Sequence, residues 1–216
     1  TDPAVTIKTG SPADVNNPNV RLEYKSQETT FNITVNDRIQ SLSVATPMTQ
    51  GEYDHGDTLN FAGLTLAAVT KSGATKTITN TTPGLAISET QADVNSPNFT
   101  KITGTSNVEV KGTQIIKFTY DGKTAQQTII VNDRISSVNI VTQPNKTAIK
   151  YGEALDLTGA TVKITLASGD TTNINLPDGS ATISTFNNTQ IGSKQKLTVT
   201  INNKTAPETI DVEAYN

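Results

Sequence analysis

The pentapeptide Val35-Asn36-Asp37-Arg38-Ile39 returns unchanged as Val131-Asn132-Asp133-Arg134-Ile135. The two copies start 96 residues apart. A solenoid unit is about 20–50 residues long, whereas a complete β-sandwich domain has about 100 residues. The period therefore predicts tandem domains, each with its own core, rather than stacked turns of one solenoid.

The repeat extends well beyond the pentapeptide. Residues 56–66 align with residues 152–162 at the same offset, and Ser72-Gly73 aligns with Ser168-Gly169. Further on, the residues that follow Tyr120 match those that follow Ile201 at an offset of 81. The first repeat therefore contains an insertion, which we place between Thr81 and Asn98, since insertions usually map to loops.

The register divides the chain into two complete repeats and one partial repeat. Residues 36–131 form the first complete repeat and residues 132–216 the second. Two short segments within residues 1–35 alternate in hydrophobicity like the last hairpin of the first repeat. We interpret residues 1–35 as the C-terminal strands of a preceding repeat. A lone hairpin is marginally stable in water, so this piece needs further strands or another surface.

Short apolar runs between turn signals favour strands throughout the chain. Gly, Pro, Asn and Asp recur too often for long helices, at the spacing of roughly 8 to 12 residues that is typical of sandwiches and barrels. Asp121-Gly122 suits a type I′ hairpin turn. The second repeat has Asp211 at the position of Ile130, so we expect that position to face solvent. The predicted fold class is all-β, with tandem antiparallel β-sandwiches.

The composition excludes several classes of protein and site. The chain has 216 residues, no cysteine and a formal net charge of −3. Without cysteine there is no disulfide and no thiolate metal site. The weak negative charge provides no basic surface for nucleic acid, and no apolar run reaches the roughly 20 residues that span a bilayer. We therefore expect no nucleic acid partner and no membrane insertion.

One stretch of the second repeat resembles a known family. Residues 151–162 place Gly-Glu before Leu-Asp-Leu-Thr-Gly, and Ser168-Gly169-Asp170 and Gly192 follow. This pattern is similar to the bacterial immunoglobulin-like modules of group 3. The resemblance covers residues 36–216 in two copies and residues 1–35 as a tail. The first copy departs from the pattern, with Asn-Phe-Ala-Gly at residues 60–63 and with the insertion.

The resemblance implies tandem immunoglobulin-like sandwiches at a bacterial cell surface or in the cell wall. It further implies a secreted, non-catalytic structural or assembly module of the S-layer or repetitive adhesin type. Such a module acts as a spacer or a lateral-contact unit, with other copies of the protein or neighbouring domains as partners. The alternatives are a recognition module for a cell-wall or host glycan or for a host protein, and spacer domains of a large extracellular glycosidase. Because fold does not dictate function, these remain expectations.

A single histidine provides the best candidate for a ligand contact. His55 lies beside Tyr53 and between Asp54 and Asp57, and a histidine near carboxylates can act as a base or a ligand. The second repeat has Tyr151 at the position of His55, which favours an ordinary loop contact. Tyr53 is the other candidate contact, and the absence of Trp weighs against a broad aromatic sugar platform. We predict no catalytic residue and no organic cofactor.

The repeated Asn-Asp pair raises the possibility of calcium at a domain junction. Calcium prefers several oxygen ligands, and we consider Asp37, Asp133, Asp54 and Asp57 as candidates. The competing interpretation is that the pair shapes a turn while the following arginine pairs with a neighbouring carboxylate, and the turn preferences of Asn and Asp favour it.

The pentapeptide also predicts a short linker. Val35 and Val131 should end the last strand of one domain, and Ile39 and Ile135 should begin the next. Fewer than about four residues then separate consecutive domains, which restricts their relative rotation and favours an elongated array.

Overall fold

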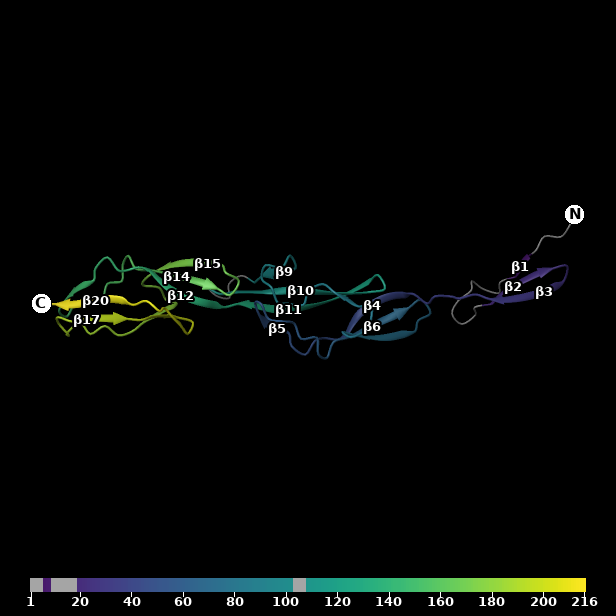
Figure 1. Cartoon of the computed structure of the whole chain (residues 1–216), viewed down its shortest axis with the longest axis horizontal. Coiled ribbons are helices and arrows are strands. Elements are labelled where there is room, and N and C mark those ends of the chain that lie inside the picture. The colour runs from purple at the N-terminus through teal and green to yellow at the C-terminus, as the bar shows by residue number, and fades with distance from the viewer. Residues whose placement is uncertain (1–5, 9–18, 103–107) are drawn as a thin grey trace. The chain divides into compact units, whose positions relative to one another are not determined.

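The computed structural model describes residues 6–8, 19–102 and 108–216 (Figure 1). The described residues form strands and turns without a helix, which confirms the all-β prediction. No helix in these ranges is long and apolar enough to cross a membrane. The strands of the partial repeat are β1 (Thr6–Lys8), β2 (Asn19–Tyr24) and β3 (Gln27–Asn32).

The two complete repeats contain the remaining strands. Those of the first repeat are β4 (Ile39–Thr46), β5 (Glu52–Asp54), β6 (Thr65–Thr70), β7 (Thr75–Thr79), β8 (Ala86–Ile87), β9 (Phe99–Lys101), β10 (Val110–Tyr120) and β11 (Lys123–Asp133). Those of the second repeat are β12 (Ile135–Thr142), β13 (Ala148–Lys150), β14 (Thr161–Leu166), β15 (Thr171–Asn175), β16 (Ala181–Ile183), β17 (Lys194–Leu197), β18 (Val199–Ile201), β19 (Lys204–Thr205) and β20 (Ile210–Tyr215).

The chain separates into two compact units that do not follow the repeat boundary. The first unit contains Thr1–Gln50, Asn60–Glu89 and Ile116–Gln127. The second contains Gly51–Leu59, Thr90–Ile115 and Thr128–Asn216, so it combines the whole second repeat with segments of the first. The division of the chain at residues 131 and 132 remains a prediction from the sequence register.

Two three-stranded sheets, one in each unit, have the same pairing. Their strand orders are β4-β6-β7 and β12-β14-β15. Ile39 pairs with Thr70 in the first sheet, and Ile135 pairs with Leu166 in the second, 96 residues later on both strands. Irregularities in the register also fall at corresponding positions. The sequence repeat is therefore a structural repeat over these strands.

The second repeat is a β-sandwich. The strands β12, β14 and β15 form one layer and β20 and β17 lie in the other (Figure 1). Residues of both layers and of β18 share one core cluster. Alternate residues of β14 and β20 are buried, as in β20, where Ile210, Val212 and Ala214 are buried and the residues between them are half-buried. Burying each large aliphatic side chain contributes about 1.5–3 kcal/mol. The core contains Ile135, Val138, Leu157, Ala160, Val162, Ile164, Leu166, Leu176, Leu197, Val199, Ile201, Ala206, Ile210 and Val212.

Tight hairpin turns close each repeat. Asp121 and Gly122 have φ of 46° and 72°, so both central residues are in the left-handed region that a type I′ turn requires, as predicted. Asn202-Asn203 and Lys25-Ser26 have the same signs. On the returning strand β11, Ile130 is half-exposed between two buried neighbours, which confirms that this position faces away from the core.

The insertion of the first repeat lies later than we predicted. Gly56 N donates to Ala92 O, and 96 residues later Gly152 N donates to Asn188 O. The 96-residue register therefore persists through Ala92, and the insertion begins after that residue. Our predicted range for the insertion, from Thr81 to Asn98, was wrong over most of its length. Two glutamines show that the insertion ends before residue 114. Gln114 Nε2 donates to Gln91 O, and Gln195 Nε2 donates to Asn187 O, the residue that corresponds to Gln91.

The extra residues provide an additional strand. Strand β9 pairs antiparallel with β10, with Phe99 opposite Gln114 and Lys101 opposite Gly112. A Cβ on Gly112 would lie 2.1 Å from the Phe99 ring and 2.5 Å from Thr100 O. Glycine is therefore required at position 112 for β9 to approach. The second repeat has Ser193 at this position, and residues 132–216, all of which the structure describes, provide no strand in the place of β9.

The two linkers differ in length. Between β11 and β12, Arg134 is the one residue outside a strand, which confirms a short linker there. Between β3 and β4, residues 33–38 are outside strands, so the prediction was wrong for the first junction. The cause lies in strand pairing. Asn132 extends β11 by pairing in parallel with Asp54 on β5, and its counterpart Asn36 has no such strand beside it in the described residues.

Candidate functional site

The second copy of the pentapeptide is held by carboxylates from the first repeat. Asn132 Nδ2 donates to Glu52 Oε1 at 2.9 Å, and Arg134 Nε donates to Asp54 Oδ1 at 2.7 Å. The backbone N–H of Ile135 donates to Glu109 Oε1 at 3.2 Å. All of these residues belong to the second compact unit. We call this set of contacts the repeat joint.

Opposite charges and hydrogen bonds shift the pKa of joint residues. The Asn132 amide, and then the Lys111 ammonium at 3.0 Å, hold the pKa of Glu52 below its usual range. Asp54 raises the pKa of the Arg134 guanidinium. The side chains of Arg134 and Asp54 are 58% and 47% exposed, so water weakens this ion pair and its main effect is on geometry.

Asp133 connects the linker to the second repeat. Its side chain is fully buried, and Oδ1 accepts the Ser168 N–H at 2.9 Å. Ala167 N donates to Arg134 O at 2.9 Å, so the linker contacts the β14–β15 turn twice. Asp133 Oδ2 is buried without a hydrogen-bond partner in the described structure. Burying a carboxylate costs free energy. Asp133 is buried here because its Oδ1 is the acceptor for the Ser168 N–H of the turn.

Apolar contacts complete the joint. Val108 of the first repeat is 9% exposed and belongs to the hydrophobic core cluster of the second repeat. Val110, at the start of β10, packs against the same cluster. Removing apolar surface from water contributes to stability without directional bonds, whereas the carboxylate contacts define orientation.

The first copy of the pentapeptide makes half of these contacts. Asp37 accepts hydrogen bonds from Ser72 N at 3.1 Å and Ser72 Oγ at 2.6 Å, and these bonds lower its pKa. Lys71 N donates to Arg38 O at 3.0 Å. Across residues 19–102 and 108–216, however, no hydrogen bond or ion pair involves the side chains of Asn36 and Arg38, and both residues are exposed.

The two candidate ligand contacts lie close to the joint. Tyr53 is 3% exposed, so its ring is part of the interior rather than an exposed contact surface. On strand β5 Glu52 is exposed and Asp54 half-buried, so Tyr53 between them lies on the inward face. The His55 side chain is 18% exposed, and its Nδ1 accepts the Val94 N–H at 3.3 Å. Asp93 Oδ1 lies 3.4 Å from the same nitrogen.

The calcium candidates are distributed rather than gathered. Asp54 binds Arg134, and the Asp54 N–H donates to Asp57 Oδ2 at 2.9 Å. Asp37 and Asp133 each bind the serine of a different turn. Among the described residues, no group of three acidic or histidine side chains is placed to hold a metal ion. Calcium binding remains a prediction for solution experiments.

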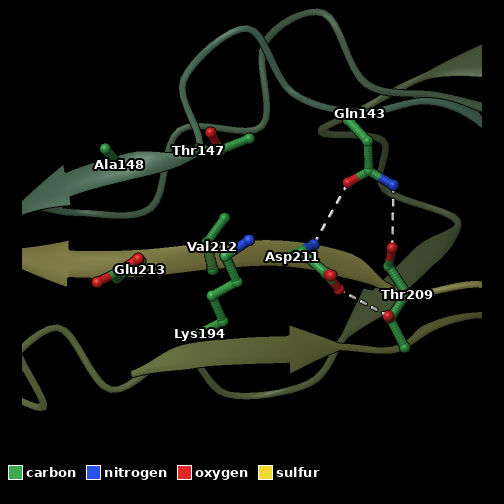
Figure 2. A pocket seen from close by; sticks show the side chains of 8 residues that line it. All are labelled: Gln143, Thr147, Ala148, Lys194, Thr209, Asp211, Val212 and Glu213. Carbon is green, nitrogen blue, oxygen red and sulfur yellow. Dashed lines mark hydrogen bonds between the residues drawn. The ribbon is translucent and has the colours of Figure 1, made fainter. Parts of the chain in front are cut away.

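A groove with mixed polar and apolar lining lies on the second repeat, along β20 and its neighbours (Figure 2). Its volume is about 410 Å³. Gln143 spans one end, where its Nε2 donates to Thr209 O at 3.0 Å and its Oε1 accepts Asp211 N at 3.3 Å. The groove has carboxylates and a lysine but no aromatic ring, and it is lined by Gln143, Thr147, Ala148, Lys194, Thr209, Asp211, Val212 and Glu213.

The pairing of Arg134 with Asp54 agrees with the interpretation that the linker arginine pairs with a neighbouring carboxylate. Sequence reasoning missed the other two carboxylates of the joint, Glu52 and Glu109, and the paired glutamines. Glu52 and Glu109 have Ala148 and Gln190 at the corresponding positions of the second repeat, so the repeat comparison does not mark them. The glutamines had a usable signal. Gln114 and Gln195 are 81 residues apart, which is the offset of the closing hairpins.

Comparison with known proteins adds a family match for part of the chain. The sequence model of the bacterial Ig-like domain (group 3) matches residues 142–214. This range lies in the second repeat and contains the residues that carry the resemblance, which is thereby confirmed there. A search of curated proteins finds no match.

A solved structure is also similar to this chain. It is described as the structure of surface layer protein SbsC, domains 4-9. The sequence identity is 16% and the TM-score is 0.21. The similarity covers 91% of this chain and 34% of the SbsC chain, so this protein spans about a third of that structure's length.

Proposed function

We propose that this protein is a non-catalytic structural module of a secreted bacterial cell-surface protein, of the S-layer or repetitive adhesin type. In this role its repeats act as spacers or lateral-contact units outside the cell. The observation that carries the proposal is the repeat joint, in which Glu52, Asp54 and Glu109 bind the linker while Val108 enters the core of the next repeat. The family match of residues 142–214 supports the same assignment.

The joint favours a mechanical role because it holds consecutive repeats on both sides of a one-residue connection. Asp133 bonds forward to the β14–β15 turn, and Asn132 and Arg134 bond backward to β5. A connection with directional bonds on both sides restricts rotation more than a polar linker of the same length. We expect the array to be elongated in solution, which small-angle scattering tests. A compact particle of this mass would contradict the spacer role.

Residual dipolar couplings of the labelled full chain test the joint directly. In the natural protein, amides of residues 51–59 and 108–115 should fit one alignment tensor together with those of residues 136–166. Asp54→Lys introduces the charge that the second repeat has at Lys150. In this variant the amides before the joint and those after it should require two different alignment tensors. Asp156→Lys makes the same charge change in an exposed loop, where Asp156 bonds Thr158 N of that same loop, and it should not separate the two sets of amides. Two independent tensors in the natural protein would contradict the proposal.

A second candidate function is recognition of a glycan or a host protein. The groove along β20 favours it, because Asp211, Glu213 and Lys194 line it and provide acceptors and a donor in one place. A glycan array and a broad hydrolase screen on the purified chain test this alternative. We expect no turnover and no saturable binding. Tight binding to one sugar that Asp211→Ala abolishes would contradict the structural proposal and favour recognition at the groove. Tight binding that His55→Ala abolishes would place the recognition site beside the joint instead.

Calcium is proposed as a secondary stabiliser at most. Asp37, Asp133, Asp54 and Asp57 already accept protein hydrogen bonds, so an ion must displace donors to gain the several oxygen ligands it prefers. Thermal unfolding with and without millimolar calcium measures the effect. We expect little change in midpoint, and a large increase that is lost in Asp54→Asn would identify a site at the joint.

A further inference from the structure

Each complete repeat ends in a parallel strand pair that bears any tension applied along the chain. In the first repeat β11 pairs in parallel with β5, and in the second β20 pairs in parallel with β13. Strands β11 and β20 are the last strands of their repeats. A pull at the end of either strand acts along its length, so the strand must slide past its parallel neighbour. The hydrogen bonds of a parallel pair are evenly spaced along the strands, so they resist this sliding together.

The backbone bonds of the two pairs are alike. Two of them in each repeat have lengths of 2.7–2.9 Å, and they are Ile130 N to Gly51 O and His55 N to Asn132 O in the first repeat, and Glu213 N to Thr147 O and Tyr151 N to Tyr215 O in the second. Gly51 and His55 precede their counterparts by the 96 residues of the repeat. Backbone pairing therefore gives neither repeat an advantage in resisting the slide.

Side chains cross-link the pair of the first repeat. Glu52 on β5 accepts Asn132 Nδ2 from β11 at 2.9 Å and Lys111 Nζ from β10 at 3.0 Å. Asn132 also donates to Tyr53 O at 3.5 Å, and it is 9% exposed, so water competes little for its bonds. One carboxylate thus joins three strands at the point where a pull from the linker enters β11. We call Lys111, Glu52 and Asn132 the strand clasp.

The second repeat has no acceptor for such a cross-link. Ala148 lies at the position of Glu52, and Tyr215 lies at that of Asn132 in the parallel register. In the second repeat, all of which the structure describes, no side-chain hydrogen bond or ion pair joins β13 to β20. The side chains of β13 are those of alanine, isoleucine and lysine, which have no acceptor atom. Strand β13 therefore cannot form a clasp with β20 or with any chain that follows it.

We propose that the second repeat unfolds before the first under tension and serves as the extensible element of the protein, while the strand clasp keeps the first repeat folded. Forced unfolding is governed by the unfolding rate rather than by equilibrium stability. A bond that must break before β11 can slide slows unfolding by its whole free energy. The inference rests on the proposed spacer function and adds an order of unfolding to it. It does not depend on the relative orientation of the repeats.

Magnetic tweezers on the full chain, held through tags at both ends, provide the test. The first repeat is about 15 residues longer than the second and each released residue adds about 3.6 Å of length, so the two unfolding steps differ by about 5 nm. The partial repeat releases a still shorter step. At constant force we expect the step of the second repeat to precede that of the first. The lifetime of the first repeat should be about fivefold longer, which corresponds to one buried hydrogen bond of about 1 kcal/mol.

Asn132→Ala should shorten the lifetime of the first repeat about fivefold and leave that of the second unchanged. The matched control is Gln114→Ala, which removes another buried amide with two bonds to the backbone of the first repeat. These bonds do not connect β5 with β11. The control should therefore lower the stability of the first repeat in denaturant, while its lifetime under force should change less than twofold.

Ala148→Glu with Tyr215→Asn tests the clasp by addition. Both positions are exposed, so the double variant leaves the core intact, and the lifetime of the second repeat should lengthen several-fold. The inference would be overturned by the first repeat unfolding before the second in the natural chain, by equal effects of Asn132→Ala and Gln114→Ala under force, or by an unchanged lifetime in the double variant. A compact particle in scattering, or two alignment tensors in the dipolar couplings, would contradict the spacer role without changing the order of unfolding, so the two proposals can fail separately.

Discussion

Residues 35–39 and residues 131–135 have one sequence and two environments. In both copies the aspartate accepts a serine N–H from the turn 35 residues further on, and the arginine carbonyl accepts the N–H before that serine. In the second copy the asparagine and arginine side chains also bind Glu52 and Asp54. In the first copy both are exposed. The linker therefore has a forward half that forms with its own repeat and a backward half that needs the carboxylates of the repeat before it.

The strongest test of the forward half is Asp133→Ala. Removing the acceptor leaves the partly buried Ser168 N–H unpaired, and we expect a loss of about 1–3 kcal/mol in unfolding free energy. The matched variant Asp37→Ala should cost less, because Asp37 is partly exposed and water replaces its bonds. Chemical denaturation of the full chain measures both. Equal losses would show that burial does not distinguish the two copies.

Asn132→Ala tests the backward half. The side chain is 9% exposed and its amide is the main cause of the lowered pKa of Glu52. We expect a loss of about 1 kcal/mol, which is the usual net value of a buried hydrogen bond. Asn36→Ala should be within about 0.5 kcal/mol of the natural protein, as is usual for exposed positions. A comparable loss at Asn36 would reveal a partner for the first copy.

A smaller effect is expected from Arg134→Ala. Its ion pair with Asp54 is more than one-third exposed on both sides, and exposed pairs contribute about 0.2–1 kcal/mol. Arg38→Ala should have no measurable effect, since no pair exists there in the described residues. A double-mutant cycle with Asp54→Ala isolates the pair. A coupling energy near zero would show that the contact orients the joint without stabilising it.

The pH dependence of the joint should be the smallest effect. The pKa of Glu52 in the folded protein is below the ordinary 4.5, so the unfolded chain binds this proton more readily. The stabilisation is therefore present above the ordinary value and is lost as the pH falls through the lowered one. Unfolding midpoints of the natural chain and Glu52→Gln should converge as the pH falls from 6 to 3. A constant difference between them would assign the contact to packing alone.

Much of the fold followed from local patterns. Alternating apolar residues, Asp121-Gly122 and the 96-residue register predicted the strands, the type I′ turn and the matching sheets, because each depends on neighbouring residues or on pairs within one repeat. The insertion was misplaced for two reasons. Residues 93–107 resemble nothing in the second repeat, and the polar residues before position 93 gave no pattern that showed the 96-residue register continuing through Ala92. The exposure of Tyr53 was misjudged because a three-residue strand gives too short a pattern to reveal its inward face.

The sequence by itself determined that two repeats exist, that they are built of strands, and that a short Asn-Asp-Arg linker joins them. These properties depend on periodicity and on the backbone preferences of single residues. Tertiary structure alone decided which carboxylates receive the linker, that Asp133 is buried while Asp37 is half-exposed, and that β9 covers one strand edge while β17 stays an outer strand. The reason is physical: burial and ion pairing depend on which distant segments the fold brings together, and two identical pentapeptides with different surroundings contain no local signal of that difference.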